Sequence, residues 1–173
     1  MYIFGGKTSV LNNSKKLYSY EFATNIWNEE NNSAESPSKQ EQVLPFAIDS
    51  HNVVLYEDNL SAEMIVFGGF LGKYSKYSNN IFAYDFKSQE WKFYYKNSFL
   101  KVPKNKSELD PVPKKRTNSS MILMRKSLYI FGGCKGNLKF NDFWKFDLMT
   151  CTWKEILYDK NIIPEVHFIK EFE

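Results

Sequence analysis

Three pairs of adjacent glycines, each ending a short apolar run, constrain what this chain can fold into. The steps between successive pairs are 63 and 64 residues, and the pairs are Gly5-Gly6, Gly68-Gly69 and Gly132-Gly133. The glycines are not expected to form a phosphate-binding loop, because no helix is predicted to begin after them. A regular period instead indicates tandem copies of one supersecondary unit.

A tryptophan follows each glycine pair with a similar period, advancing by 64 and then 62 residues. Seven positions before each tryptophan stands an aromatic residue, and an acid follows that aromatic directly. The three sets are Tyr20, Glu21 and Trp27; Tyr84, Asp85 and Trp91; and Phe146, Asp147 and Trp153. Alternating apolar residues around a short polar turn predict a hairpin in each copy. Asp85 and Asp147 are expected to hydrogen-bond to their turns.

The second copy shows the whole predicted unit. Short strands are expected at His51–Tyr56, Met64–Phe67 and Ile81–Phe86, and a fourth strand surrounds Trp91. No long stretch has helical periodicity. Four consecutive antiparallel strands per repeat predict an all-β chain built from β-propeller blades.

The glycine pair, the aromatic residue and the tryptophan, at this spacing, resemble the kelch repeat. The likeness has departures: the stretch that usually opens a kelch repeat keeps only His51 or Arg116 here, and the period exceeds the roughly 50 residues usual for kelch. The resemblance implies that residues 1–173 form a partial propeller of about three blades. Its predicted parts are blades at 1–30, 45–95 and 112–157, long crossover loops at 28–44 and 96–116, and the first strand of a further or shared blade at 164–173.

The predicted ring is incomplete, because the first copy starts at its second strand and propellers close with four to eight blades. Two explanations are open. The remaining blades belong to a longer polypeptide, or two chains form a six-bladed ring in which each lends residues 167–172 to its partner.

Composition excludes several classes of protein. The aromatic content of 17% can fill a substantial core, and a formal net charge of +3 is too small to indicate a nucleic-acid partner. No apolar run approaches the roughly 20 residues of a membrane span, and no signal peptide is predicted. Two cysteines, Cys134 and Cys151, do not form a disulfide framework. A cytoplasmic protein is expected.

The loops after the glycine pairs are the predicted binding region. Residues 70–80 mix tyrosine with lysine, a composition suited to a protein contact. Residues 101–116 are basic and proline-containing, and form either a docking surface for an acidic partner or a solvated loop. The predicted protein-binding residues are Lys73, Tyr74, Lys76, Tyr77, Lys114, Lys115 and Arg116.

No catalytic residue, metal site or cofactor is predicted. The two histidines, His51 and His167, each stand at the start of a predicted strand and are expected to be structural. Copper oxidases within the family would need several converging imidazoles and tyrosinates. The resemblance therefore implies a non-enzymatic adaptor or scaffold that binds a protein. The alternative is the recognition domain of a larger enzyme, such as a kelch-containing phosphatase.

Overall fold

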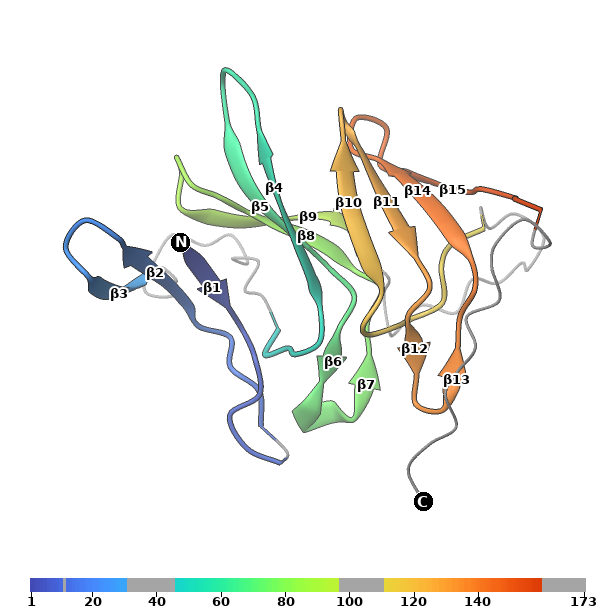
Figure 1. Cartoon of the computed structure of the whole chain (residues 1–173), viewed down its shortest axis with the longest axis horizontal. Coiled ribbons are helices and arrows are strands. Elements are labelled where there is room, and N and C mark those ends of the chain that lie inside the picture. The colour runs from blue at the N-terminus through green and yellow to red at the C-terminus, as the bar shows by residue number, and fades with distance from the viewer. Residues whose placement is uncertain (11, 31–45, 97–110, 160–173) are drawn as a thin grey trace, which may run out of the picture.

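The computed structural model describes residues 1–10, 12–30, 46–96 and 111–159. Within these residues the chain forms three antiparallel sheets that stand side by side, in agreement with the predicted all-β kelch-type segment (Figure 1). The described residues include one helix, the short 3-10 turn η1 (Gly72–Tyr74). No helix in these ranges is long and apolar enough to cross a membrane.

Each sheet contains strands that follow one another along the chain. The first sheet is β1 (Tyr2–Phe4), β2 (Leu17–Glu21) and β3 (Ile26–Glu30). The second sheet is β4 (Asn52–Glu57), β5 (Ala62–Phe67), β8 (Ile81–Asp85) and β9 (Glu90–Tyr95). The third sheet is β10 (Ser120–Met124), β11 (Ser127–Phe131), β14 (Phe143–Asp147) and β15 (Thr152–Glu155).

Two small hairpins extend the loops after the second and third glycine pairs. They are β6 (Phe70–Leu71) with β7 (Lys76–Tyr77), and β12 (Cys134–Lys135) with β13 (Leu138–Lys139). Sequence reasoning predicted plain loops in both places. Each hairpin pairs through two residues per strand, which is too short for a recognisable alternating pattern.

Strand register explains the seven-residue spacing between aromatic and tryptophan. The two residues are direct cross-strand partners in all three sheets, as Tyr84 is of Trp91 and Phe146 of Trp153. Cross-strand partners share a face of the sheet, so their rings pack together. The ring centroids of Tyr84 and Trp91 are 5.2 Å apart, and those of Phe146 and Trp153 are 4.8 Å apart.

Asp85 and Asp147 stabilise the turns that follow them, as predicted. Asp85 accepts hydrogen bonds from the backbone N–H groups of Lys87 and Ser88, both at 2.8 Å. Asp147 accepts the equivalent bonds from Met149 and Thr150. These backbone hydrogen bonds, the one from Ser88 foremost in the first turn, lower the pKa of both carboxyl groups.

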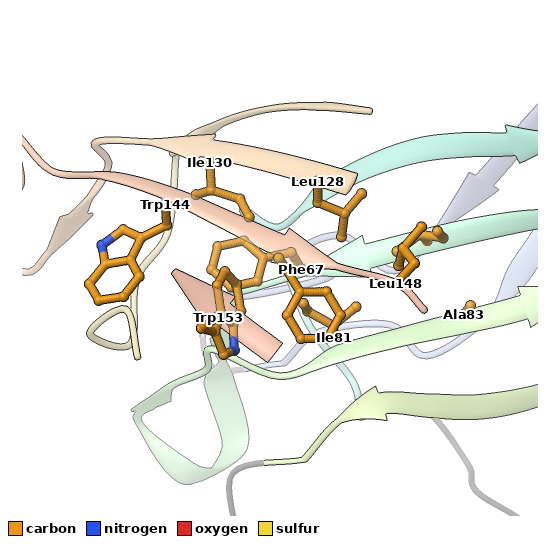
Figure 2. Packing of buried hydrophobic residues seen from close by; sticks show 10 residues of the cluster. Phe67, Ile81, Ala83, Leu128, Ile130, Trp144, Leu148 and Trp153 are labelled. Atoms are coloured by element: carbon orange, nitrogen blue, oxygen red, sulfur yellow. The ribbon is translucent and has the colours of Figure 1, made fainter. Parts of the chain in front are cut away.

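The hydrophobic core lies between the sheets, and the tryptophans join one sheet to the previous one. Trp91 of the second sheet packs against Phe4 of the first, with ring centroids 4.8 Å apart. Trp153 of the third sheet packs in the same way against Phe67 of the second, at 5.7 Å (Figure 2). Both indoles are buried. The indole rings of Trp91 and Trp153 therefore join neighbouring repeats.

The same repeat positions are uncovered at the two outer faces. Trp27 occupies the position of Trp91 and Trp153 but is 50% exposed. Phe131 occupies the position of Phe4 and Phe67, which are 6% and 0% exposed, yet it is 38% exposed. The first and third sheets thus each present an aromatic face of the kind that is buried between the described sheets.

The glycine pairs allow two backbones to meet. Gly69 has a φ of +96°, and a Cβ placed there would lie 2.6 Å from the side chain of Ile48. Its N–H donates to the carbonyl oxygen of Arg116, at the entry to the third sheet, at 2.9 Å. Gly6 donates in the same way to Ile48, at the entry to the second sheet, at 2.8 Å. The pairs therefore receive the incoming backbone of the next blade and, at Gly69, the side chain of Ile48 as well.

Parts of the predicted domain organisation fall outside the described residues. These parts are most of both crossover loops and the strand expected at 164–173. Residues 28–30, which the prediction placed both in the first blade and at the start of the crossover loop, belong to β3. They pair with Leu17, Tyr18 and Ser19 of β2.

Candidate protein-binding face

The sheets have two chemically different ends. One end, which we name the glycine face, consists of the loops after the glycine pairs and the entries to the first strands. Its residues are 5–10, 12–16, 46–51, 68–80, 111–119 and 132–142. The opposite end, the turn face, consists of the tight turns between strands, residues 21–26, 57–63, 85–90, 124–127 and 147–152. In Figure 1 the glycine face is at the bottom and most of the turns point upwards or outwards.

Hydrogen bonds join the loops of the glycine face to one another. The backbone N–H of Gly136, in the β12–β13 hairpin, donates to the hydroxyl of Tyr77, in β7, at 3.0 Å. Asn13 of the first loop donates through Nδ2 to the carbonyl oxygen of Phe70 at 2.6 Å. These bonds connect loops from three consecutive repeats, so the face is one continuous structure.

A hollow of about 490 Å³ opens on the glycine face, where the three sheets converge. Its walls combine aromatic side chains with polar and charged groups from all three repeats. The lining residues are Gly6, Lys7, Asp49, Ser50, Phe70, Tyr77 and Thr117. The hollow is open to solvent, and polar and apolar groups contribute to its lining in similar amounts.

Charge separates between the two ends. The described residues of the glycine face contain two acids, Asp49 and Asp142, and nine lysines, which are Lys7, Lys15, Lys16, Lys73, Lys76, Lys114, Lys115, Lys135 and Lys139. The turn face carries Lys87, Arg125 and Lys126 against Glu21, Glu57, Asp58, Glu63, Asp85, Glu90 and Asp147. The small net charge of the whole chain therefore conceals a basic end and an acidic end.

Four of the seven predicted binding residues present exposed side chains on the glycine face: Lys73, Tyr74, Lys76 and Lys114. Tyr74 lies in η1 and is 58% exposed. Tyr77 and Lys115 are half-buried. The Tyr77 ring packs on the Phe70 ring, with centroids 5.1 Å apart, and its hydroxyl accepts the hydrogen bond from the Gly136 N–H. Tyr77 therefore also holds loops of the glycine face together.

The prediction that Arg116 contacts a partner is wrong. Its side chain is completely buried, and its guanidinium donates to both carboxylate oxygens of Asp142 at 2.6 and 2.7 Å. It also donates to the carbonyl oxygen of Gly132 at 2.8 Å and lies 4.5 Å from the ring centre of Phe140. Arg116 therefore ties the entry of the third sheet to the loop after its glycine pair.

Burial of Lys115, together with the nearby ammonium groups of Lys135 and Lys76, lowers the pKa of Lys115. These three lysines come from separate segments: the entry to β10, β12 and β7. Sequence reasoning missed Lys135, because it lies 20 residues from Lys115 in a loop without tyrosines. The sequence signal that could have identified Lys135 was its position close to a glycine pair, which Lys7 shares.

His51 has a packing role. Its ring lies edge-on to Phe4, with centroids 5.5 Å apart, and burial lowers the pKa of its imidazole. Its Nδ1 is buried without a hydrogen-bond partner, so the structural role expected for His51 is one of packing and not of hydrogen bonding through that atom. His167 lies outside the described residues. Within the described ranges, Cys134 and Cys151 are free thiols and no cluster of metal-binding residues occurs.

Almost the whole chain matches a known protein family. A family model described as the KLHDC2/KLHL20/DRC7 Kelch-repeats domain matches residues 1–169. The match covers all three sheets and the glycine face.

Individual relatives are more distant. The chain is 28% identical over 178 residues to Tip elongation aberrant protein 3 of Schizosaccharomyces pombe, covering 90% of this chain and 15% of that protein. It is 25% identical over 168 residues to Kelch domain-containing protein 10 of Rattus norvegicus, covering 90% and 35% respectively. It is 29% identical over 112 residues to the N-(sulfonatooxy)prop-2-enimidothioate sulfolyase of Thlaspi arvense, covering 64% and 28%. The chain thus spans about a third or less of the length of these relatives.

Proposed function

The chain belongs to the kelch-repeat family, and on this premise we propose that it is a protein-interaction module, an adaptor or scaffold, that binds a protein partner through its glycine face. The observation that carries this proposal is the elaboration of one end of the sheets. Extra hairpins, a hollow and nine of the lysines gather there, whereas the opposite end has tight turns. Loops on a rigid scaffold are the usual seat of recognition.

Site-specific photo-crosslinking tests this proposal. A benzoylphenylalanine is placed at Tyr74 on the glycine face and, as a matched control, at Phe22 on the turn face. Both side chains are aromatic and exposed, at 58% and 70%. The chain is then illuminated in an extract of the organism that makes it, and the protein adducts are identified by mass spectrometry.

A discrete protein adduct from position 74, absent from position 22, is the expected result. Tyr74→Ala should then weaken the complex without changing the melting temperature, because an exposed side chain contributes little to folding. Tyr77→Phe is preferred to an alanine variant, since the Tyr77 ring supports Phe70. Adducts from position 22 alone, or from neither position, would refute binding through the glycine face.

We also propose that further kelch blades cover the two outer faces, supplied by a longer polypeptide or by a second copy of the chain. The exposure of Trp27 and Phe131, at positions that are buried elsewhere, supports this. Sedimentation equilibrium separates the two sources. A mass of two chains, reduced to one by Trp27→Glu, indicates the two-copy ring, whereas a monomer at all concentrations indicates blades from the same polypeptide.

The alternative function is the recognition domain of a larger enzyme. Two observations support this alternative. The chain spans a small part of the length of its relatives, and one relative is named as a sulfolyase. The sequence of the full-length polypeptide would decide, because a catalytic domain beside these repeats would establish the alternative. Our proposal includes a cytoplasmic location, which fractionation of cells that express the tagged protein would test.

A further inference from the structure

The third sheet stands at one end of the row of sheets, so the second sheet covers one of its faces and its other face is an outer one (Figure 1). Side chains alternate between the two faces along each strand. Trp144 and Phe146 of β14 are buried in the core shared with the second sheet, so Lys145 between them points to the outer face. On β15, Trp153 is buried in that core and the next residue, Lys154, points outward. The outer face therefore carries two lysines, which we name the lysine pair.

Strand register places the lysine pair side by side. Lys145 is the direct cross-strand partner of Lys154 on β15 and of Tyr129 on β11. Like charges directly opposite each other destabilise a pair of strands. Among the described strands of this sheet, Asp147 is the acid on the outer face, and Lys145 acts on its carboxylate. That carboxylate also accepts two backbone hydrogen bonds from its own turn. One committed acid thus faces two lysines, and the outer face keeps a net positive charge.

The second sheet shows how the same positions are filled when another sheet covers them. The repeat equates two rows of cross-strand partners, Ile65, Ala83 and Lys92 in the second sheet with Tyr129, Lys145 and Lys154 in the third. Ile65 and Ala83 have no exposed surface. The Lys92 ammonium pairs with the buried carboxylate of Glu63 at 2.6 Å, and the third sheet has Ser127 at the Glu63 position. A covered face of this repeat thus has an alanine and a neutralised lysine where the outer face has two lysines and a serine.

The surface around the lysine pair is apolar. The Phe143 ring packs on the rings of Phe131 and Tyr129, with centroids 6.2 and 6.0 Å apart. Ile122 and Met124 of β10 are 60% and 52% exposed. Covering this face removes apolar surface from water, which is favourable. It also removes water from two ammonium groups, which is costly unless a carboxylate takes the place of that water.

Resting on the proposal that further blades cover the outer faces, we propose that the blade covering the third sheet places a carboxylate against the lysine pair, and that this blade is not a second copy of the chain. Its remaining contact surface is apolar and packs on the aromatic side chains of the outer face. The acid performs for the lysine pair the part that Glu63 performs for Lys92 in the second sheet.

A second copy of the chain lacks the required charge. In a ring of two copies, the third sheet of one copy meets the outer face of the first sheet of the other. Among the described strands of the first sheet, Glu29 is the acid on that outer face, beside Tyr18. Its carboxylate already pairs with the Lys16 ammonium at 2.8 Å. Two third sheets facing each other would instead oppose lysine to lysine. A blade of different sequence is therefore the better match.

Zero-length crosslinking tests the proposal on the protein purified from the organism that makes it. A carbodiimide joins a lysine ammonium to a carboxylate in direct contact with it and adds no spacer, and mass spectrometry then identifies the joined peptides. The pairs Lys16–Glu29 and Lys92–Glu63, at 2.8 and 2.6 Å, are the internal positive controls. We expect an amide between the lysine pair and an Asp or Glu that lies outside residues 1–173.

Two crosslinking results would overturn the inference. If the lysine pair is joined to carboxylates of another copy, which a mixture of chains grown in light and heavy nitrogen reveals, then the covering element is a second copy. If both internal controls react but the lysine pair forms no crosslink, then no carboxylate lies against it. The crosslinks are measured on the wild type, so they remain decisive whatever happens to a variant.

A charge-reversal variant supplies an independent readout. In the protein from the organism, Lys145→Glu/Lys154→Glu would set acid against acid at a covered face, and the melting temperature should fall by about 5 °C or more. The matched control, Lys87→Glu/Lys126→Glu, makes the same change in charge at exposed positions of the turn face and should shift it by about 1 °C or less. Equal shifts would contradict the proposal, since total charge alone would then explain them.

Lysine acetylation separates this inference from the coverage on which it rests. The rates at Lys145 and Lys154 are compared between the protein from the organism and the chain of residues 1–173 expressed alone. We expect both lysines to lose most of their reactivity in the former. Loss of reactivity without any crosslink would mean that the face is covered but no acid is supplied, so coverage would stand and the inference would fail. Equal rates in both samples would mean that the face is uncovered, and both proposals would fail.

Discussion

Asp142→Ala is expected to destabilise the third sheet strongly. Arg116, which it binds, has no exposed side-chain surface, and the two form a bidentate pair with N–O distances of 2.6 and 2.7 Å. The carbonyl oxygens of Gly132 and Lys114 also accept from the guanidinium, but neither carries a compensating charge. Removing the carboxylate therefore leaves a buried cation unpaired, which costs about 3–5 kcal/mol.

Urea denaturation followed by tryptophan fluorescence measures this loss as a change in the free energy of unfolding. In a chain of this size, about 1 kcal/mol corresponds to about 2–4 °C, so the melting temperature should fall by roughly 10 °C. Asp142→Asn keeps the shape and one acceptor, and it should lie between the wild type and Asp142→Ala.

The contribution of Asp142 also depends on pH. Burial alone would raise the pKa of this carboxyl group, but hydrogen bonds from Arg116 and Trp144 hold it below its ordinary value. A lowered pKa in the folded state stabilises the protein above the unfolded-state pKa of about 3.9, and this contribution is lost as the pH falls through the folded-state pKa. The difference between the wild type and Asp142→Asn should accordingly shrink below about pH 4.

The control is Glu155→Ala, which removes an exposed carboxylate from β15. It should change the free energy of unfolding by no more than about 0.5 kcal/mol. A similarly small change for Asp142→Ala would refute the reasoning, since it would mean that the guanidinium of Arg116 regains solvent or another partner without cost.

Three further predictions follow from burial. Gly69→Ala should cost about 2–4 kcal/mol, because its Cβ would meet the Ile48 side chain at 2.6 Å, whereas Gly6→Ala, with open space around it, should cost about 1 kcal/mol. Trp153→Ala should cost about 3–5 kcal/mol and the half-exposed Trp27→Ala about 1 kcal/mol. Burial and a hydrogen bond to Glu63 raise the pKa of Tyr94 to about 12, so Tyr94→Phe should remove the last step of the alkaline absorbance titration.

Each of these comparisons has a clear contrary outcome. Equal losses for the two glycine variants would mean that backbone strain, and not contact with Ile48, dominates at Gly69. Equal losses for the two tryptophan variants would mean that Trp27 is covered in solution. A wild-type titration that ends near pH 10, the ordinary tyrosine value, would contradict the buried hydrogen bond between Tyr94 and Glu63.

The sequence alone was sufficient to predict the strands of the three main sheets and their order, but not the two short hairpins β6–β7 and β12–β13. The signals are local: Tyr84 and Trp91 are seven residues apart because they are partners across one short hairpin, and Asp85 follows because the turn needs an acceptor. Alternation with period two and the repeated glycines report directly on strand and turn geometry. The signals for strands and turns are therefore present in each copy of the repeat, and the other two copies show them again.

Part of the candidate site could also be predicted, since the exposed Lys73, Tyr74 and Lys76 lie in the loop chosen from its composition. Composition could not separate Lys115, which is half-buried, from its neighbour Arg116, which is completely buried. The two residues are adjacent and both basic. Their difference depends on Asp142, 26 residues further along the chain, and on the space left between two sheets.

The tertiary structure decided which charges meet and which repeat positions stay uncovered. Tyr77 meets Gly136 across two hairpins, Arg116 meets Asp142, and the exposure of Trp27 depends on which sheet faces it. Short-range patterns determine the conformation of each blade because backbone hydrogen bonds connect near neighbours. Burial and electrostatics depend on distances in space between residues far apart in the chain, so they emerge only when the blades pack.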